Sequence, residues 1–331
     1  MIDRMSVYVT KNTNPYRNLA LEEYLTFHAE PGECILFLWQ NRRTVVIGKN
    51  QNCWKECHVS LLEKDGGFLV RRLSGGGAVF HDLGNLNFTF CVRREDYDVK
   101  RQLSVILKAV HSLGINAEKT GRNDLTIDGK KFSGNAFYES GDFCYHHGTL
   151  LLSADTEAMA RYLAVSEEKL RSKGVDSVRA RVANLGELCP GLCAEQMEKA
   201  LIRACEDVYG CSAEKIADAR LDTERILKYE ERFASWEWKY GRKIPFQYEV
   251  KRRFPWGEIE LQFEVNGGVV RNVNAFSDGM DPALIALLPE MWQGVRYEKR
   301  MLLEKLEAAA AHTALQQMMK LDIGRLLDEE L

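Results

Sequence analysis

The sequence has no apolar run that approaches the roughly 18 residues of a membrane-spanning helix. Its first residues, MIDRMSVYVTKN, lack the apolar core of a secretory signal. Basic residues are not in excess either, because 45 Lys and Arg stand against 48 Asp and Glu and give a net charge of -3. A nucleic-acid-binding domain usually carries a basic patch or stripe. These absences predict a cytoplasmic protein with neither a membrane nor a nucleic acid among its partners.

Disulfide bonds and a structural metal site are not expected. The nine cysteines are an odd number in a large chain without a signal, which favours reduced cytosolic thiols. Cys53 and Cys57, and also Cys189 and Cys193, have a loose metal-ligand spacing, but neither pair forms a zinc-finger pattern. We therefore expect no tightly bound metal.

The length of 331 residues favours two domains, since domains commonly hold about 150 residues. Near the end of the chain, apolar strands at 258–265 and 269–275 are joined by an Asn-Gly-Gly turn and followed by two helical patterns. Strands followed by helices favour a small α+β unit. We expect one domain over residues 1–244 and a second over residues 250–331.

The first domain mixes helices and strands. Asn14 and Pro15 are suited to cap and to begin a helix, and a second helix is predicted over residues 100–113. Apolar runs typical of strands occur between and around these helices, at residues 34–39, 44–48, 68–72 and 86–92.

The stretch RRLSGGGAVFHDLGNLNFTF, residues 71–90, concentrates the chemistry of the first domain. Gly75, Gly76 and Gly77 have no Cβ, so the backbone can adopt positive φ and approach a ligand closely. Their peptide N–H groups can form a concavity that binds an anion. Arg71 and Arg72 precede the loop, and planar guanidinium groups suit carboxylate or phosphate oxygens. The stretch predicts a carboxylate or phosphate site; a glycine-rich hairpin with surface arginines is the alternative.

The common phosphate-binding motifs do not fit this stretch. No Lys-Ser or Lys-Thr follows the glycines, as a P-loop requires. The residues after the glycines have the pattern of a strand, whereas the dinucleotide fingerprint opens a helix. The predicted anion site therefore belongs to neither the P-loop nor the dinucleotide-binding class.

A second cluster, GRNDLTIDGKKFSGNAFYE at residues 121–139, predicts a hairpin that turns at Asp128-Gly129. Lys130 and Lys131 are adjacent in the following strand, so they face opposite sides and one of them can point into a site. Asp124 lies before the turn, where its carboxylate can hold Mg²⁺ or cap a local turn.

Two further segments carry candidate residues. Ser133-Gly134 permits a close backbone approach, and His147 is interpreted as a hydrogen-bonding group or a satisfied core histidine. Residues 163–185 are rich in Lys and Arg, among them Lys173 and Arg179. Such a segment is either a solvated basic loop or a lid that closes over a bound phosphate.

Four motifs together resemble the lipoate–protein ligase family: RRLSGGGAVFHDLGNLNFTF, GRNDLTIDGKKFSGNAF, HHGTLLL and RSKGVDSVRARVANL. Their order and spacing match the family, and SWEWKYG with the C-terminal part resembles the family's small accessory domain. The resemblance covers nearly the whole chain. It implies a biotin/lipoyl ligase-like α+β fold, with a mixed sheet in the catalytic domain and a small α+β C-terminal domain.

The resemblance also implies an activity. Lipoate and ATP would give lipoyl-AMP and pyrophosphate. The lipoyl group would then pass to a lysine on a lipoyl domain of a 2-oxoacid dehydrogenase E2 subunit or on the glycine-cleavage H protein. Mg²⁺ would accompany ATP, octanoate would be an alternative to lipoate, and the protein would act as a monomer.

The match to the family's motifs, taken with the residue chemistry, indicates the site residues. Lys131 would be catalytic and would touch both the lipoate carboxylate and the α-phosphate. The ATP site would comprise Arg72, Gly77, Ala78, Val79, Phe80, Asp124, Lys131, Lys173 and Arg179. The lipoate site would comprise Arg71, Arg72, Ser74, Gly75, Gly76, Gly77, His81, Lys131, Ser133, Gly134 and His147.

Elementary chemistry supports this mechanism independently. Activating a carboxylate brings two anions together, and a lysine between them offsets the repulsion and stabilises charge that grows at phosphorus. The lipoate carboxylate itself attacks, so no protein nucleophile is needed. Phe80, Phe88 and Phe90 are candidates for apolar walls around an aliphatic chain.

Two alternatives remain at the level of the sequence. A lipoyl or octanoyl amidotransferase shares the implied fold, needs no ATP and forms an acyl-enzyme on a cysteine, for which Cys144 close to His146 and His147 is the candidate. A non-catalytic module that binds lipoyl domains is the other. The intact glycine loop and Lys131 argue against the second.

Overall fold

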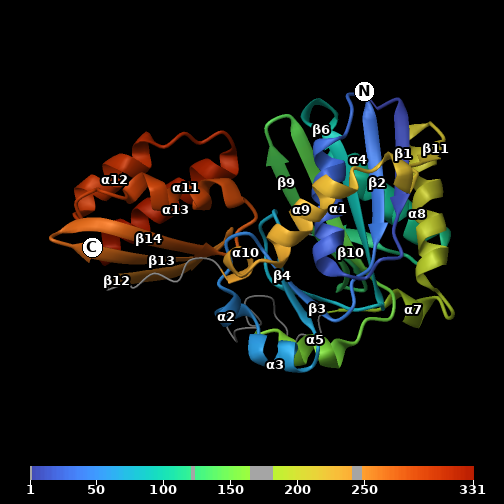
Figure 1. The fold of residues 1–331 in the computed structure, drawn as a ribbon, viewed down its shortest axis with the longest axis horizontal. Helices are drawn as coiled ribbons and strands as arrows, with labels where there is room; N and C mark the ends of the chain where they lie inside the picture. Colours follow the sequence, from blue (N-terminus) through green and yellow to red (C-terminus); the bar gives the residue numbers. More distant parts are fainter. Residues whose placement is uncertain (1, 121–123, 165–181, 241–247) are drawn as a thin grey trace. The chain divides into compact units, whose positions relative to one another are not determined.

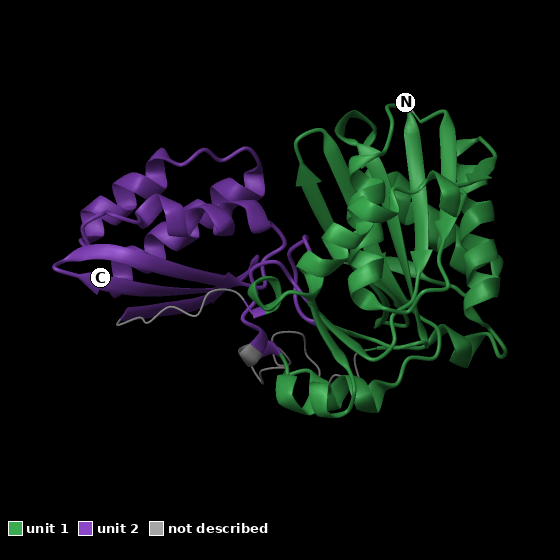
Figure 2. Ribbon diagram, in the orientation of Figure 1, with its two compact units in different colours: residues 1–46, 57–70, 79–239 green, residues 47–56, 71–78, 240–331 purple. Residues whose placement is uncertain are grey.

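The computed structural model describes residues 2–120, 124–164, 182–240 and 248–331. The chain forms two compact units (Figure 2). The first comprises residues 1–46, 57–70 and 79–239, and the second comprises residues 47–56, 71–78 and 240–331. No helix among the described residues has both the length and the apolar character needed to cross a membrane.

An eight-stranded mixed sheet forms the centre of the first unit (Figure 1). Strand β1 pairs in parallel with β2 and β11, and the remaining neighbours pair antiparallel. In spatial order the strands are β11 (Ala213–Lys215), β1 (Arg4–Val9), β2 (Glu33–Trp39), β6 (Asn85–Arg93), β10 (Phe143–Leu151), β9 (Lys130–Ser140), β8 (Asp124–Ile127) and β7 (Glu118–Thr120). This mixed sheet confirms the α+β fold class expected from the sequence.

Helices cover both faces of the sheet (Figure 1). Helix α1 (Pro15–Phe27) packs on β2, β6 and β10, and α9 (Thr223–Ala234) packs on α1. Helix α1 begins as predicted, because the side chain of Asn14 accepts a hydrogen bond from the Tyr16 N–H and Pro15 takes the first helical position. Helix α4 (Val99–Ser112) packs on α8 (Ala194–Tyr209) over the main apolar core.

The predicted turn at Asp128-Gly129 joins β8 to β9. The two residues have φ of 50° and 76°, the left-handed conformations that a two-residue hairpin turn requires. A second hairpin turns at Gly141, with φ of 55°, and joins β9 to β10. The Gly141 turn makes the Lys131 and His147 segments adjacent strands, and the Asp128-Gly129 turn places Asp124 on the other side of the Lys131 strand.

A small sheet and four short helices lie between these elements along the chain. The sheet has the order β4 (Phe68–Arg71), β3 (Thr44–Ile47) and β5 (Val79–His81). The chain between β4 and β5 is the glycine loop, and the segment after β3 runs into α2. The helices are α2 (Cys53–Glu56), α3 (Val59–Lys64), α5 (Thr156–Tyr162) and α7 (Leu185–Leu188).

The C-terminal part of the second unit is an antiparallel sheet with three helices. The strands are β12 (Tyr248–Phe254), β13 (Gly257–Asn266) and β14 (Val269–Ser277), and the helices are α11 (Pro282–Trp292), α12 (Lys299–Ala308) and α13 (Ala314–Glu330). Trp292 is fully buried in their shared core and donates from Nε1 to the Leu302 carbonyl at 3.0 Å. The predicted strands and helices are present here, and the structure adds β12 and α13.

Candidate active site

A β-bulge in β9 fixes the direction in which Lys131 points. Leu125 pairs with Ser133, but Thr126 pairs with Lys131, so Phe132 is an extra residue in β9. Phe132 is fully buried in the core beneath α4. A bulge of this kind shifts the alternation of side chains by one residue. Lys131 therefore points to the α1 side of the sheet instead of the α4 side.

On that face the Lys131 ammonium lies over the backbone of Gly134, which carries no side chain. Its Nζ is 2.7 Å from Oδ1 of Asp124, and the two side chains are 26% and 29% exposed. A Cβ on Gly134 would lie 2.9 Å from both Cε and Nζ of Lys131, so only glycine leaves room for this position. The Gly134 N–H donates to Oγ1 of Thr149 at 3.1 Å. Lys131 is held, yet it remains accessible to a ligand.

The end of the Lys- and Arg-rich segment, residues 163–185, lies beside Lys131. Val182 forms a parallel bridge with Lys131, and the Ala183 N–H donates to the Lys131 carbonyl at 2.9 Å. Lys173 and Arg179 themselves lie outside the described residues, and their assignment stays a prediction from the sequence.

A buried polar network lies on the same face of the sheet as Thr149. Nδ1 of His147 is 2.8 Å from Oε1 of Glu22, which also accepts a 2.7 Å hydrogen bond from Thr89. Trp39 in turn donates from Nε1 to Thr89 at 3.1 Å. Glu22 is only 2% exposed. His147 is a candidate from the sequence, whereas Glu22 and Thr89 lie in apolar patterns that do not single them out.

His81 reaches this network from β5. Its ring centroid is 6.1 Å from that of Trp39, and its Nδ1 is 3.3 Å from Nδ2 of Asn41. His81 and His147 thus lie on either side of the Trp39–Thr89–Glu22 chain. Both side chains are buried, and His147 is held in the free protein by its contact with Glu22.

Phe88 and Phe90 lie on the opposite face of the sheet. Both are fully buried in the core beneath α4, where they surround His146. They therefore form no wall on the face that carries the Lys131 ammonium. Phe80 lies in β5, where it is buried against Tyr162.

Residues 71–78, which contain the glycine loop, belong to the second unit, and hydrogen bonds from Arg72 hold the loop in its conformation. Arg72 donates to the carbonyls of Gly75 and Gly77 at 2.6 and 2.8 Å, and to the Ser74 hydroxyl at 3.0 Å. Gly76 has φ of 86°, and its N–H donates to the Gly279 carbonyl at 3.1 Å. A bound carboxylate or phosphate has to compete with these contacts.

Arg71 connects the loop to the segment after β3. Its Nη1 contacts the carbonyls of Gly48, Lys49 and Gln51 at 2.6 to 3.1 Å. Burial lowers the pKa of Arg71 to about 10. A Cβ on Gly48 would lie 2.2 Å from the Gly76 carbonyl oxygen, so the two segments meet through bare backbone. Gly48 is a structural requirement of this loop that the sequence did not reveal.

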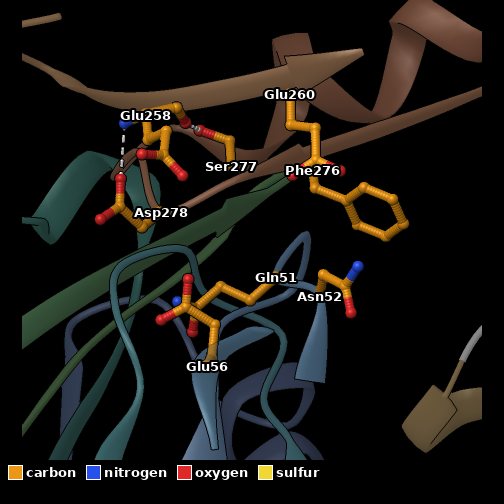
Figure 3. Close-up of a pocket in the computed structure, with 8 residues that line it drawn as sticks. All are labelled: Gln51, Asn52, Glu56, Glu258, Glu260, Phe276, Ser277 and Asp278. Carbon is orange, nitrogen blue, oxygen red and sulfur yellow. Dashed lines mark hydrogen bonds between the residues drawn. The ribbon is translucent and has the colours of Figure 1, made fainter. Parts of the chain in front are cut away.

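A separate small hollow lies within the second unit (Figure 3). The Glu258 N–H donates to Oδ1 of Asp278 at 2.6 Å, and the Ser277 hydroxyl donates to the Glu258 carbonyl at 2.6 Å; both contacts are drawn in Figure 3. Four carboxylates line the hollow and disfavour an anionic ligand, so we leave it outside the candidate site. The lining residues are Gln51, Asn52, Glu56, Glu258, Glu260, Phe276, Ser277 and Asp278.

Cys144 is a poor nucleophile in this structure. Its side chain is fully buried, and burial raises the pKa of its thiol to about 11, with the nearby Glu139 charge acting in the same direction. Attack requires the thiolate. Close to neutral pH the thiol is therefore protonated and has no access to a substrate.

Comparison with known proteins places the chain in a family. Residues 14–206 match the lipoyl protein ligase A/B catalytic domain, and residues 243–327 match the bacterial lipoate protein ligase C-terminus. The chain is 43% identical over 295 residues to the lipoate-protein ligase A of Psychrobacter cryohalolentis, which is 87% of each protein.

Solved structures agree with this placement. The structure of P. falciparum LipL1 in complex with lipoate has a TM-score of 0.86 and 30% identity, over 97% of this chain and 99% of that one. A structure of the bipartite lipoate protein ligase of Thermoplasma acidophilum, from a study with its E2 lipoyl domain, has a TM-score of 0.64 and 26% identity. That match covers 73% of this chain and 98% of the archaeal one.

The burial of Cys144 predicts slow alkylation. In the folded protein, iodoacetamide should modify the exposed Cys193 long before Cys144, because Cys144 is buried and its pKa is raised to about 11. Peptide mass spectrometry of a time course measures both rates, and a sample unfolded in denaturant is the control in which the two should converge. Equal rates in the folded protein would contradict the described burial.

Proposed function

The chain belongs to the lipoate–protein ligase family, and from this premise we propose that it activates free lipoate with ATP and transfers the product. The first step forms lipoyl-AMP and releases pyrophosphate. The second passes the lipoyl group to a lysine of a lipoyl domain. The observation that carries the proposal is the Lys131 ammonium, held over Gly134 and still about a quarter exposed.

Lys131 is assigned the central role in activation. Its ammonium can contact the lipoate carboxylate and the α-phosphate together and offset their mutual repulsion. Such a preorganised cation is most effective where negative charge grows in the transition state. In the free protein Asp124 pairs with it at 2.7 Å. Because both side chains are partly exposed, we expect a phosphate or carboxylate ligand to replace this contact at low cost.

The remaining site residues are assigned by their motifs. We assign Arg71, Arg72 and residues 74–77, with His81, Lys131, Ser133, Gly134 and His147, to lipoate. We assign residues 77–80 and Arg72, with Lys173 and Arg179, to ATP. Residues 1–244 are proposed as the catalytic domain and residues 250–331 as the accessory domain, and this division is supported by separate family matches over residues 14–206 and 243–327.

Mg²⁺ is proposed to arrive with ATP. The described residues contain no group of three or more His, Cys, Asp or Glu side chains able to hold a metal. Mg²⁺ commonly binds through one or two carboxylates together with substrate phosphates and water. Asp124 fits that pattern as a single protein carboxylate beside Lys131. The metal would neutralise phosphate charge while Lys131 positions the reacting groups.

The proposed acceptors are lipoyl domains of 2-oxoacid dehydrogenase complexes and the glycine-cleavage H protein. The archaeal relative was studied with its E2 lipoyl domain, which supports the first class. The same proposal has the enzyme act in the cytoplasm, as the sequence predicts, and as a monomer.

A direct assay separates this function from its alternatives. Pyrophosphate release should require both lipoate and Mg-ATP, and a purified lipoyl domain should gain the mass of one lipoyl group. The Cys144→Ser variant should retain this activity, because a buried protonated thiol forms no acyl-enzyme. Acceptor modification from a lipoyl donor without ATP, lost in Cys144→Ser, would indicate an amidotransferase, and binding without modification would indicate a non-catalytic module.

The two adjacent lysines provide a matched comparison. Lys131→Ala should lower lipoyl-AMP formation by about 10²–10³-fold, as expected for the loss of a group that stabilises transition-state charge. Lys130→Ala should have little effect, because Lys130 is exposed on the other side of the strand. Both rates are measured as pyrophosphate release. Equal losses would show that the assignment of Lys131 is wrong.

Gly134 should control the position of the same ammonium. In Gly134→Ala the new methyl group would lie 2.9 Å from Lys131 Cε and Nζ, so the flexible lysine has to move. We expect lipoyl-AMP formation to fall by about tenfold or more, since small displacements of reacting groups are costly, with an unchanged thermal midpoint. Gly324→Ala, whose methyl group meets only ordinary contacts at 3.8 Å, is the control.

A further inference from the structure

His146 is a buried titratable residue that the proposed chemistry does not use. It is adjacent to His147 in β10, so its side chain points to the α4 side of the sheet. It is fully buried, and the rings of Phe88, Phe90 and Phe137 surround it at centroid distances of 5.5, 5.8 and 4.9 Å. Such an apolar setting strongly disfavours a charged ring.

Both ring nitrogens of His146 contact side-chain amides. Nδ1 is 3.2 Å from Oε1 of Gln102 in α4, and Nε2 is 2.9 Å from Oδ1 of Asn135 in β9. Two acceptors require two ring protons, which only the charged form has. Burial lowers the pKa of His146 to about 3, and the charges of His147 and Lys119 act in the same direction. The ring is therefore neutral and has a single N–H.

The amide of Gln102 resolves this conflict. Within the described part of the chain, its Nε2 is buried and has no hydrogen-bond partner. The oxygen and nitrogen of a side-chain amide exchange places on a half-turn, and the hydrogen-bond network decides between the two. Turning Gln102 lets its Nε2 donate to Nδ1 of His146. The ring proton then lies on Nε2 and is donated to Asn135, so every contact has one donor and one acceptor.

This chain of hydrogen bonds ends beneath the Lys131 ammonium. Asn135 directly follows Gly134, the residue over which Lys131 lies. A Cβ on Gly148 would be 2.8 Å from Oδ1 of Asn135 and 2.7 Å from the Gly134 carbonyl oxygen, so both oxygens pack on the bare backbone of β10. The amide of Asn135 also contacts the Ser133 hydroxyl at 3.4 Å. Asn135 therefore packs directly against the backbone on which Lys131 rests.

We propose that His146 is a positioning residue for Lys131: in its neutral form, protonated on Nε2, it anchors Asn135 and thereby the Ser133–Asn135 backbone. It transfers no proton in the reaction. The inference rests on the proposed role of Lys131 in lipoyl-AMP formation.

Two substitutions of similar volume test the anchor. In His146→Gln an amide N–H can still donate to Asn135, whereas His146→Leu leaves Oδ1 of Asn135 buried without that donor. We expect His146→Leu to lower kcat for lipoyl-AMP formation by about 10–100-fold, because small displacements of a catalytic group cost on that order. KM for ATP and lipoate should change little, since Lys131 acts mainly in the transition state. His146→Gln should retain most of the wild-type kcat.

The pH dependence separates positioning from proton transfer. The pH–rate profile of His146→Gln should keep the shape of the wild-type profile, because a ring that stays neutral contributes no titration. Loss of one limb of the profile in His146→Gln, or equal loss of kcat in the Gln and Leu variants when both unfold at the wild-type temperature, would overturn the proposal.

Nitrogen-15 NMR of histidine-labelled full-length protein tests the ring directly, even if His146→Leu fails to fold. The His146 signals are identified by their absence from the His146→Gln spectrum. Nε2 should be protonated and Nδ1 unprotonated throughout about pH 5–8, where an unperturbed histidine titrates. A protonated Nδ1, or titration within that range, would refute the proposal. Lys131→Ala is assayed in parallel, so that failure of the Lys131 assignment is recognised separately from failure of the His146 assignment.

Discussion

One extra residue in β9 decides where the Lys131 ammonium lies. Without the bulge at Phe132, strand alternation would turn Lys131 toward the α4 core and Phe132 toward the α1 face. With the bulge, the phenyl ring is fully buried in the apolar core and the lysine shares a face with Asp124, Gly134 and Thr149. The single bulge therefore has two effects: it buries Phe132 in the core, and it places the Lys131 ammonium on the opposite face of the sheet.

The cations of the candidate site differ in how firmly they are held. Lys131 and Asp124 are about a quarter exposed, and an ion pair of that kind contributes about 0–1 kcal/mol. Arg71 and Arg72 are 7% and 5% exposed and hydrogen-bond to several main-chain carbonyls, which costs desolvation and fixes loop geometry. This difference suits Lys131 to an exchange of partners during a reaction and suits the arginines to maintaining the loop.

Sequence patterns predicted the parts of the fold that local chemistry determines. Asn14 and Pro15 start α1, and Asp128-Gly129 forms the hairpin turn, because capping and positive φ depend on those residues alone. Strand β12 was not predicted, since it lies at the edge of its sheet and, among mostly charged side chains, only Val250 is buried. The Phe132 bulge and the Glu22–His147 contact depend on strand register and tertiary packing, which no local pattern encodes.

The adjacent histidines of β10 show how the sheet separates two kinds of chemistry. His147 meets the Glu22 carboxylate on the α1 face, whereas His146 meets only amides and phenyl rings on the α4 face. Identical side chains one residue apart thus acquire different roles because alternation places them in different layers. Any influence of the α4 layer on Lys131 has to pass through the backbone of β9. Gly134 and Gly148, where the backbone is bare on both strands, are the places where that influence is most direct.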